Sequence, residues 1–188
     1  MDAKGAIEAS FKEIIKRKPY GKISISEVCE HAGVSRKAFY AHFQNKEAIV
    51  SELFDKHVVK RFRDIHSILG HDDRVSITQS SLQSIYDSLF SEREYYLNLV
   101  RPMRGQDDTF IRVVTNALYE LNRKSIPVMD RIEEDWEQDY VAYFFASSQA
   151  MLIQKWISDK MAVSPAQLAG LYSSITLPFW WNLSEWQR

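Results

Sequence analysis

The sequence predicts an all-α protein, with an N-terminal three-helix head and a larger C-terminal helical domain. Apolar residues recur at helical spacing in successive segments, as in the run of Ile7, Phe11, Ile14 and Ile15. Helix-start signals precede several segments, and no segment shows the sustained alternation of a half-buried strand. The 188 residues, 45% of them hydrophobic, suffice for one large core or two small ones.

Residues 24–46 are predicted to form two short helices joined by a tight turn. Ser24 and Glu27 have the spacing of a capping box, in which the hydroxyl accepts the Glu27 N–H and the carboxylate reaches back to the cap. Gly33 can adopt the left-handed conformation that ends a helix. Ser35 opens the second helix, which is about two turns long.

This second helix has an apolar face, with Ala38, Phe39 and Phe43, and a face that has little core to fill. The residues on the free face are basic or aromatic: Arg36, Lys37, Tyr40 and His42. A short helix of this composition has the size and chemistry to enter a DNA major groove.

A long helix is expected over 46–69, with Asn45 as its cap. Its first amides and the Lys46 cation make a positive helix end that suits a phosphate. Because this helix leaves the head, the expected domains are 1–47 for DNA binding and 70–188 for the body, with the long helix as the connection.

The head resembles the N-terminal DNA-binding domain of the TetR family of bacterial transcriptional repressors. The signature is AGVSRKAFYAHFQNKEAIV, with the preceding ISISEVCEH as its first half. The resemblance covers residues from about 7 to 60 and is specific, because G-V-S, F-Y-x-H-F and N-K-E follow at fixed spacing. It implies a homodimer on a palindromic double-stranded DNA operator, with a small-molecule effector bound in the body.

By match to the family motif, DNA contacts fall on the recognition helix and on the helix starts beside it. The predicted DNA-binding residues are Ser24, Ser35, Arg36, Lys37, Tyr40, His42 and Lys46. Arg36 is our choice for a base-edge contact, since a guanidinium pairs bidentately with guanine. Ser24 and Lys46 are expected to hold phosphates.

The charge distribution fits a DNA-binding head on an acidic body. Residues 1–63 carry 13 Lys and Arg against 8 Asp and Glu, whereas residues 64–188 carry 11 against 17. No apolar run is long enough to span a membrane or to act as a signal peptide, so the expected compartment is the cytoplasm. Cys29 lies on the apolar side of its helix and is expected to be a packed thiol.

The body is expected to hold five helices joined by short loops. They fall near 76–91, 92–103, 108–132, 137–160 and 165–181. The fourth is apolar around nearly its whole circumference, and the last has an apolar stripe of Leu168, Leu171, Tyr172, Ile175 and Phe179. Two such helices from each of two subunits can form an isologous four-helix contact, as the family resemblance also implies. The alternative is that both helices are internal core.

A pocket for the effector is expected in the body. Pro127 interrupts the 108–132 helix and frees the carbonyl of Arg123, beside polar groups on the fourth body helix. The candidate ligand-binding residues are Tyr119, Arg123, Tyr140, Phe144 and Gln149. The alternative is that the proline only ends a helix and the aromatic residues fill a dry core. The charge of the ligand stays open.

No catalytic residue, metal or cofactor is expected. His66, His71, Asp72 and Asp73 lie near one another, but their spacing matches no familiar metal site. The sequence has no Gly-rich phosphate loop, no H-E-x-x-H and no G-x-S-x-G.

The sequence and the resemblance together favour a ligand-responsive DNA-binding transcriptional regulator, a repressor rather than an activator. One alternative is a helical small-molecule-binding protein or enzyme whose head no longer binds DNA. The presence of Arg36, Lys37, Tyr40 and Lys46 together argues against it. Another alternative is a regulator controlled by a partner protein instead of an effector.

Overall fold

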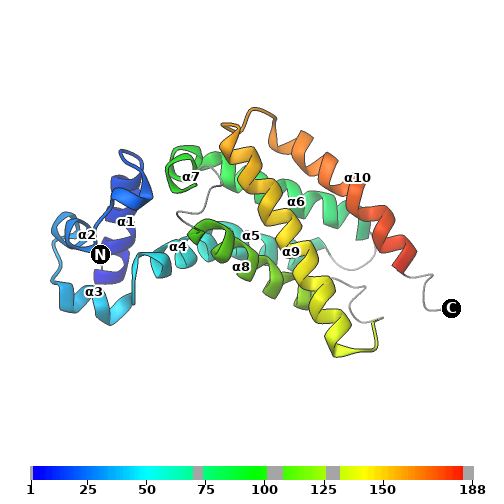
Figure 1. Ribbon diagram of the computed structural model, residues 1–188, viewed down its shortest axis with the longest axis horizontal. Coiled ribbons are helices and arrows are strands. Elements are labelled where there is room, and N and C mark those ends of the chain that lie inside the picture. Colours follow the sequence, from blue (N-terminus) through cyan, green and yellow to red (C-terminus); the bar gives the residue numbers. More distant parts are fainter. Residues whose placement is uncertain (1, 70–73, 101–107, 126–131, 184–188) are drawn as a thin grey trace.

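The protein is helical throughout the residues that the computed structural model describes (Figure 1). Those residues are 2–69, 74–100, 108–125 and 132–183. The head lies at one end of the elongated molecule, and the C-terminal helix lies toward the other. The predicted fold class is confirmed.

The head packs its helices around a small apolar core. The elements are α1 (Ala3–Ile15), the 3-10 turn η1 (Tyr20–Lys22), α2 (Ile25–Ala32) and α3 (Arg36–His42). Phe11, Val28 and Phe39 are fully buried between them, and Cys29 is buried as predicted. The Tyr20 ring meets Phe11 edge-on, with 6.2 Å between ring centroids. The turn after α1 is therefore anchored in the core of the head.

Local capping explains where the short helices begin and end. The Ser24 hydroxyl accepts the Glu27 N–H at 3.2 Å, and the Ser35 hydroxyl accepts the Ala38 N–H at 3.1 Å. Gly33 ends α2 with a φ of 66°, as its position predicts. The capping box at Ser24 is only half formed, because the Glu27 carboxylate pairs with Lys18 at 2.5 Å.

The connecting helix runs without a break from α4 (Lys46–Phe54) through η2 (Asp55–Val59) to α5 (Lys60–Leu69). Asn45 caps it as predicted, with its side-chain oxygen 2.9 Å from the Ala48 nitrogen. The middle segment, η2, is a π-helical turn, which the sequence did not predict. This turn packs on both α6 and α8, so the helix enters the body there.

The body is a stack of helices on the connecting helix. They are α6 (Arg74–Ser91), α7 (Arg93–Leu99), α8 (Thr109–Ser125), α9 (Asp135–Ser158) and α10 (Pro165–Leu183). α8 packs along α9, and α10 packs along α6. Ser164 and Gln167 form a complete capping box at the start of α10. Pro127 lies outside the described residues. None of the described helices is long and apolar enough to cross a membrane.

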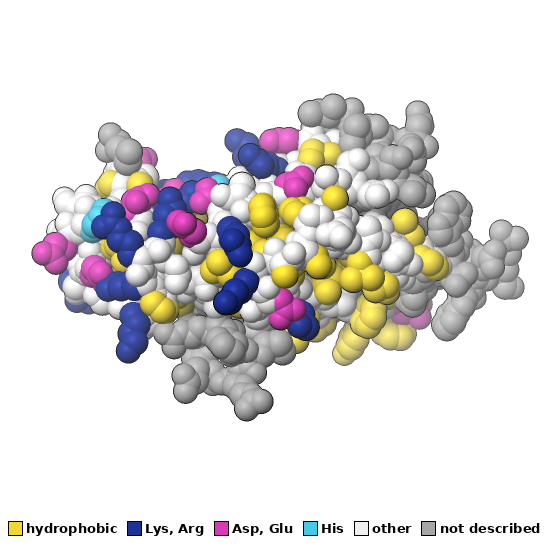
Figure 2. Space-filling view, turned by 90° about the horizontal axis from the view of Figure 1, so that it is seen from above, with side chains coloured by type: hydrophobic (Ala, Val, Ile, Leu, Met, Phe, Trp, Pro, Cys, Tyr) yellow, Lys and Arg dark blue, Asp and Glu magenta, His cyan; other side chains and the backbone are white. Residues whose placement is uncertain are grey.

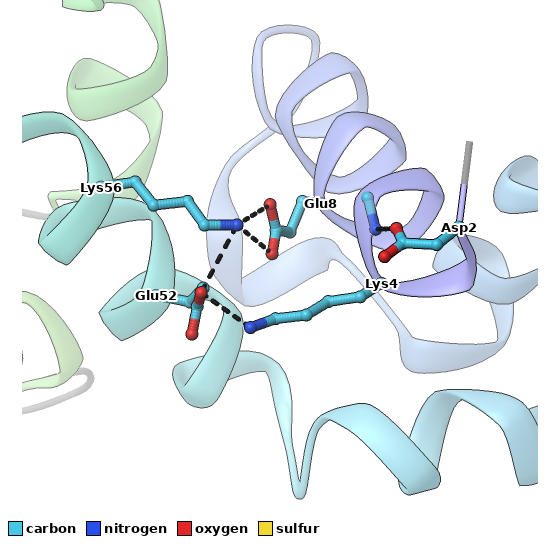
Figure 3. Close-up of polar contacts among 6 residues, drawn as sticks. Asp2, Lys4, Glu8, Glu52 and Lys56 are labelled. Atoms are coloured by element: carbon cyan, nitrogen blue, oxygen red, sulfur yellow. Dashed lines mark hydrogen bonds and ion pairs between the residues drawn. The ribbon is translucent and has the colours of Figure 1, made fainter.

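An ion-pair network fastens the connecting helix to α1 (Figure 3). Lys56 places its ammonium 2.8 and 2.7 Å from the two carboxylate oxygens of Glu8, a residue that is only 8% exposed. Glu52 lies between two cations, 2.7 Å from Lys4 and 3.4 Å from Lys56. Two acids and two bases thus alternate across this contact.

The head also docks directly on the body, through α1 and α7. The Phe11 and Tyr95 rings meet edge-on with 6.3 Å between centroids, and Lys12 pairs with Glu92 at 2.7 Å. The side-chain amide of Asn98 donates to the Lys16 carbonyl. The buried apolar cluster is consequently continuous from head to body.

We expect Glu52→Gln to lower the free energy of unfolding by about 0.5–1 kcal/mol at pH 7, measured by urea denaturation, because it removes a partly exposed double ion pair. The hydrogen bond from Lys4 holds the pKa of Glu52 below its ordinary value of 4.5. A lowered folded-state pKa stabilises the fold above pH 4.5, and this contribution disappears as the pH falls through the folded-state pKa. The difference between variant and wild type should therefore persist at pH 5 and vanish in stronger acid.

The matched control is Glu13→Gln, which removes an exposed carboxylate paired with Lys16 at the end of α1. We expect this variant to unfold like the wild type. An equal loss of stability in both variants would show that the network across α1 and α4 adds nothing.

Candidate nucleic-acid interface

The free face of α3 is exposed as predicted. Phe39 and Phe43 are buried beneath the helix, and Ala38 is half-buried. The exposed side chains of α3 are Arg36, Lys37, Tyr40, Ala41 and His42. Figure 2 shows the Lys and Arg side chains gathering toward the head and hydrophobic side chains spreading over the body. The head therefore presents a short helix with a basic and aromatic surface.

Arg36 is held in place by neighbours on two helices. Its guanidinium donates to the Ser26 hydroxyl at 3.0 Å and to the Tyr40 hydroxyl at 3.4 Å, and it lies 5.9 Å from the Tyr40 ring centroid. The Tyr40 ring rests edge-on against buried Phe39. A guanidinium ordered in this way loses less freedom when it pairs with a base edge. Ser26 was not predicted, because only the crossing of α2 and α3 brings it beside Arg36.

Lys46, the predicted phosphate contact, also makes bonds within the head. Its ammonium donates to the carbonyls of Ile23 at 2.6 Å and Tyr20 at 3.2 Å, and it lies 4.5 Å from the Tyr20 ring centroid. The last carbonyls of a helical turn carry negative partial charge and attract a cation. Lys46 thus ties the start of α4 to η1. Ser24 and Ser35 lie at the exposed starts of α2 and α3, where their hydroxyls cap the helices.

A bidentate ion pair joins the residue after Lys46 to the body. The Arg112 Nε donates to the Glu47 Oε1 at 2.8 Å, and its Nη2 donates to the other carboxylate oxygen. The Nη1 donates to Asp108 at 2.7 Å. Hydrogen bonding to Glu47 raises the pKa of Arg112 above its ordinary value. Sequence reasoning could not pair residues that lie 65 positions apart.

The two last helices leave an apolar stripe uncovered. Tyr140 is 71% exposed and Ile175 is 64% exposed. The exposed residues of the stripe are Trp136, Tyr140, Tyr143, Phe144 and Met151 on α9 and Leu171 and Ile175 on α10. Leu168 and Tyr172, which the sequence placed on the same stripe, are buried inside the protomer. We call this set of exposed residues the α9–α10 face.

The five predicted ligand-binding residues do not come together. The Tyr119 hydroxyl donates to Asp139, and Arg123 donates to the same hydroxyl at 3.1 Å, so these groups form a cross-link between α8 and α9. Tyr140 and Phe144 belong to the exposed α9–α10 face. Gln149 is buried, because nine residues along a helix of 3.6 residues per turn place it about 180° around α9 from Tyr140.

A cleft of about 470 Å³ lies between the connecting helix and α8. Its walls are formed by residues of α4 and η2 such as Ser51 and Asp55, and by residues of α8 such as Asn116 and Lys124. A smaller cavity of about 110 Å³ lies at the turn between α9 and α10. None of the five predicted ligand-binding residues lines either space.

Within the described residues, no group of three or more His, Cys, Asp or Glu side chains is placed to hold a metal. This result does not test the group of His and Asp residues over 66–73 that was considered in the sequence. His71, Asp72 and Asp73 lie outside the described residues, and so does the side chain of His66.

Known proteins match both halves of the chain. Residues 7–53 match the N-terminal model of the tetR family of bacterial regulatory proteins, and residues 78–177 match a transcriptional regulator C-terminal region. The dhaKLM operon activator DhaS of Lactococcus lactis is 26% identical over 87 residues, which are 45% of this chain and 46% of that protein. The regulator EthR of Mycolicibacterium smegmatis is 35% identical over 60 residues, which are 32% of this chain and 27% of that protein.

Solved structures share the whole fold. The dihydroxyacetone kinase operon activator DhaS superposes with a TM-score of 0.58 at 19% identity, covering 94% of both chains. A putative TetR-family regulator from Syntrophomonas wolfei gives a TM-score of 0.66 at 16% identity, covering 93% of this chain and 94% of the other. The two matched regions include the recognition helix and more than half of the chain. The protein therefore belongs to the TetR family of DNA-binding transcriptional regulators.

Proposed function

We propose that the protein is a homodimeric repressor that binds a palindromic operator and is released from it by a small-molecule effector. In this proposal residues 1–47 bind DNA, the helix over 46–69 connects, and residues 70–188 bind the effector and dimerise. The observation that carries the proposal is the exposed face of α3, on which Arg36 is ordered by Ser26 and Tyr40. The protein acts by binding and not by catalysis.

Dimerisation is supported by the α9–α10 face. Large aromatic residues rarely gather on a surface that stays in water, and a contiguous apolar patch marks a contact with another molecule. Because the α9–α10 face includes residues of both helices, the same face of a second copy can cover it by two-fold symmetry. Two-fold symmetric heads then require inverted half-sites about one helical turn of DNA apart.

The direction of regulation is part of the proposal. EthR, NalD and DhaS are relatives or structural neighbours; the first is named a regulator, the second a repressor of a multidrug efflux pump, and the third an activator. An activator would use the same α3 face. A reporter gene placed behind the selected operator separates the two, since adding a repressor lowers expression and adding an activator raises it.

The cleft between the connecting helix and α8 is the candidate effector site. Its volume of about 470 Å³ falls in the range of small-molecule pockets. A ligand there would touch α4 within two residues of Lys46 and would also touch the body. Such a ligand can favour one angle of the head on the body, and so shift the population of dimers that fit the operator.

Arg36→Ala should reduce the preference for the operator over random DNA by about 5- to 150-fold, since a bidentate base contact gives about 1–3 kcal/mol of discrimination. A binding-site selection with purified protein supplies the operator, and titrations at fixed salt measure both affinities. Ser26→Ala should reduce the same preference to a smaller extent. Lys46→Ala should lower the affinity for the operator and for random DNA alike, and should make both affinities depend less on salt. An unchanged affinity ratio in Arg36→Ala would rule out base reading by this residue.

Leu171→Glu should separate the subunits and abolish tight operator binding. Leu171 is 50% exposed in the protomer, so the new carboxylate does not disturb a buried core. Sedimentation at micromolar concentration measures the dimer. The control is Ala166→Glu, which adds the same charge to the exposed first turn of α10, about 140° around the helix. A wild type that is monomeric, or a Leu171→Glu variant that stays dimeric, would contradict the proposed interface.

Asn116→Trp should fill the cleft and abolish the response to an effector while operator binding stays intact. Asn116 is exposed on α8, so a larger side chain there leaves the core undisturbed. Compounds that raise the melting temperature of the wild type are tested for release of the operator from both proteins. Asp87→Trp, on the exposed face of α6, controls for an added surface aromatic. If a compound releases the operator equally from wild type and Asn116→Trp, the effector binds outside this cleft.

A further inference from the structure

Glu47 and Arg112 link the DNA-binding head to the body at a point beside the recognition helix. Glu47 is the second residue of α4, and α3 ends at His42. Arg112 stands on the first turn of α8, in the body. The Arg112 Nε and Nη2 both donate to the Glu47 carboxylate, and Nη1 donates to Asp108, the residue just before α8.

This geometry restricts orientation as well as distance. A guanidinium that meets both oxygens of a carboxylate fixes the planes of the two groups, whereas a lysine ammonium would fix only their separation. Asp108, at the start of α8, holds the Arg112 side chain from a second side, so little side-chain freedom remains to be lost. Partly exposed ion pairs contribute little to stability, and the pair is better suited to setting an angle than to holding the fold together.

The first turn of α4 is bonded to the head. Asn45 caps it, and Lys46 is bonded to the Ile23 and Tyr20 carbonyls of the head. Phe43, between α3 and this turn, is buried in the core of the head. The orientation of the Glu47 carboxylate is therefore coupled to the orientation of α3.

We propose that Arg112 is a positioning residue for operator binding, which through Glu47 sets the angle of the head on the body and thereby the separation of the two recognition helices. The inference rests on the proposed operator binding by a dimer. It adds a body residue, remote from the DNA-contacting face of α3, that determines which half-site spacing the dimer accepts.

A simple charge effect makes a different prediction from positioning. Removing the Arg112 cation should weaken the attraction of the protein to DNA, and removing the Glu47 anion should strengthen it. Positioning requires that both changes weaken operator binding, because either one breaks the same contact. It also requires non-additivity, since the double variant loses nothing that a single variant has not already lost.

The experiment compares full-length wild type with Arg112→Gln, Glu47→Gln and the double variant, at one salt concentration. Affinity is measured for the selected operator and for a series in which the half-site spacing changes by single base pairs. We expect each single variant to bind the selected operator at least about fivefold more weakly, and the double variant to match the singles. All three should discriminate less between spacings, and Arg112→Lys should not restore discrimination.

The matched control is Lys155→Gln, which removes one positive charge from an exposed ion pair with Asp159 in the body. It should keep the wild-type affinity and spacing preference. Sedimentation and melting temperature confirm that all variants are folded dimers.

Opposite effects of Arg112→Gln and Glu47→Gln on affinity would overturn the inference, as would additive losses or a spacing preference equal to that of the wild type. If the wild type itself selects no palindromic site, the proposed function fails and the inference fails with it. A wild type that selects such a site, with variants that change affinity in opposite directions, refutes only the positioning role.

Discussion

The connecting helix has to contribute to two cores, and the π-helical turn makes this possible. Its buried residues fall in pairs: Ile49 with Val50, Leu53 with Phe54, and Val58 with Val59. The pairs are spaced by four residues and then by five. In a regular α-helix the third pair would lie about 180° from the first, facing away from the core. The Lys60 N–H instead bonds to the Asp55 carbonyl, and this wider turn returns Val58 and Val59 to the buried side.

Polar contacts surround this helix where the head meets the body. Lys56 in the π-helical turn pairs with Glu8 of α1, and Glu47 near the start of the helix pairs with Arg112 of α8. The Phe11–Tyr95 contact and the continuous apolar cluster add packing between the two parts. Polar and apolar contacts together therefore hold the head in one defined orientation on the body.

Sequence reasoning succeeded where structure is determined locally and failed where it depends on distant partners. The caps at Ser24, Ser35 and Asn45 need only the next few residues, and all three form. The placement of Lys46 depends on the η1 carbonyls, which lie more than twenty residues earlier. The fourth body helix is apolar all round, so its sequence could not reveal which side faces inward. The predicted ligand pocket combined residues from both sides for that reason.

Large apolar residues lie on both faces of α9. Ala142, Ala146 and Ala150 face inward, where they let α9 approach its neighbours, while Trp136 and Tyr140 point outward. Because the outer face exposes large apolar side chains in addition to those that α9 buries, that face is suited to burial against a second copy. The helices α9 and α10 lie in the body, away from α3 (Figure 1). Because the two recognition helices lie far from the proposed dimer axis, a small rotation of each head produces a larger displacement at the DNA.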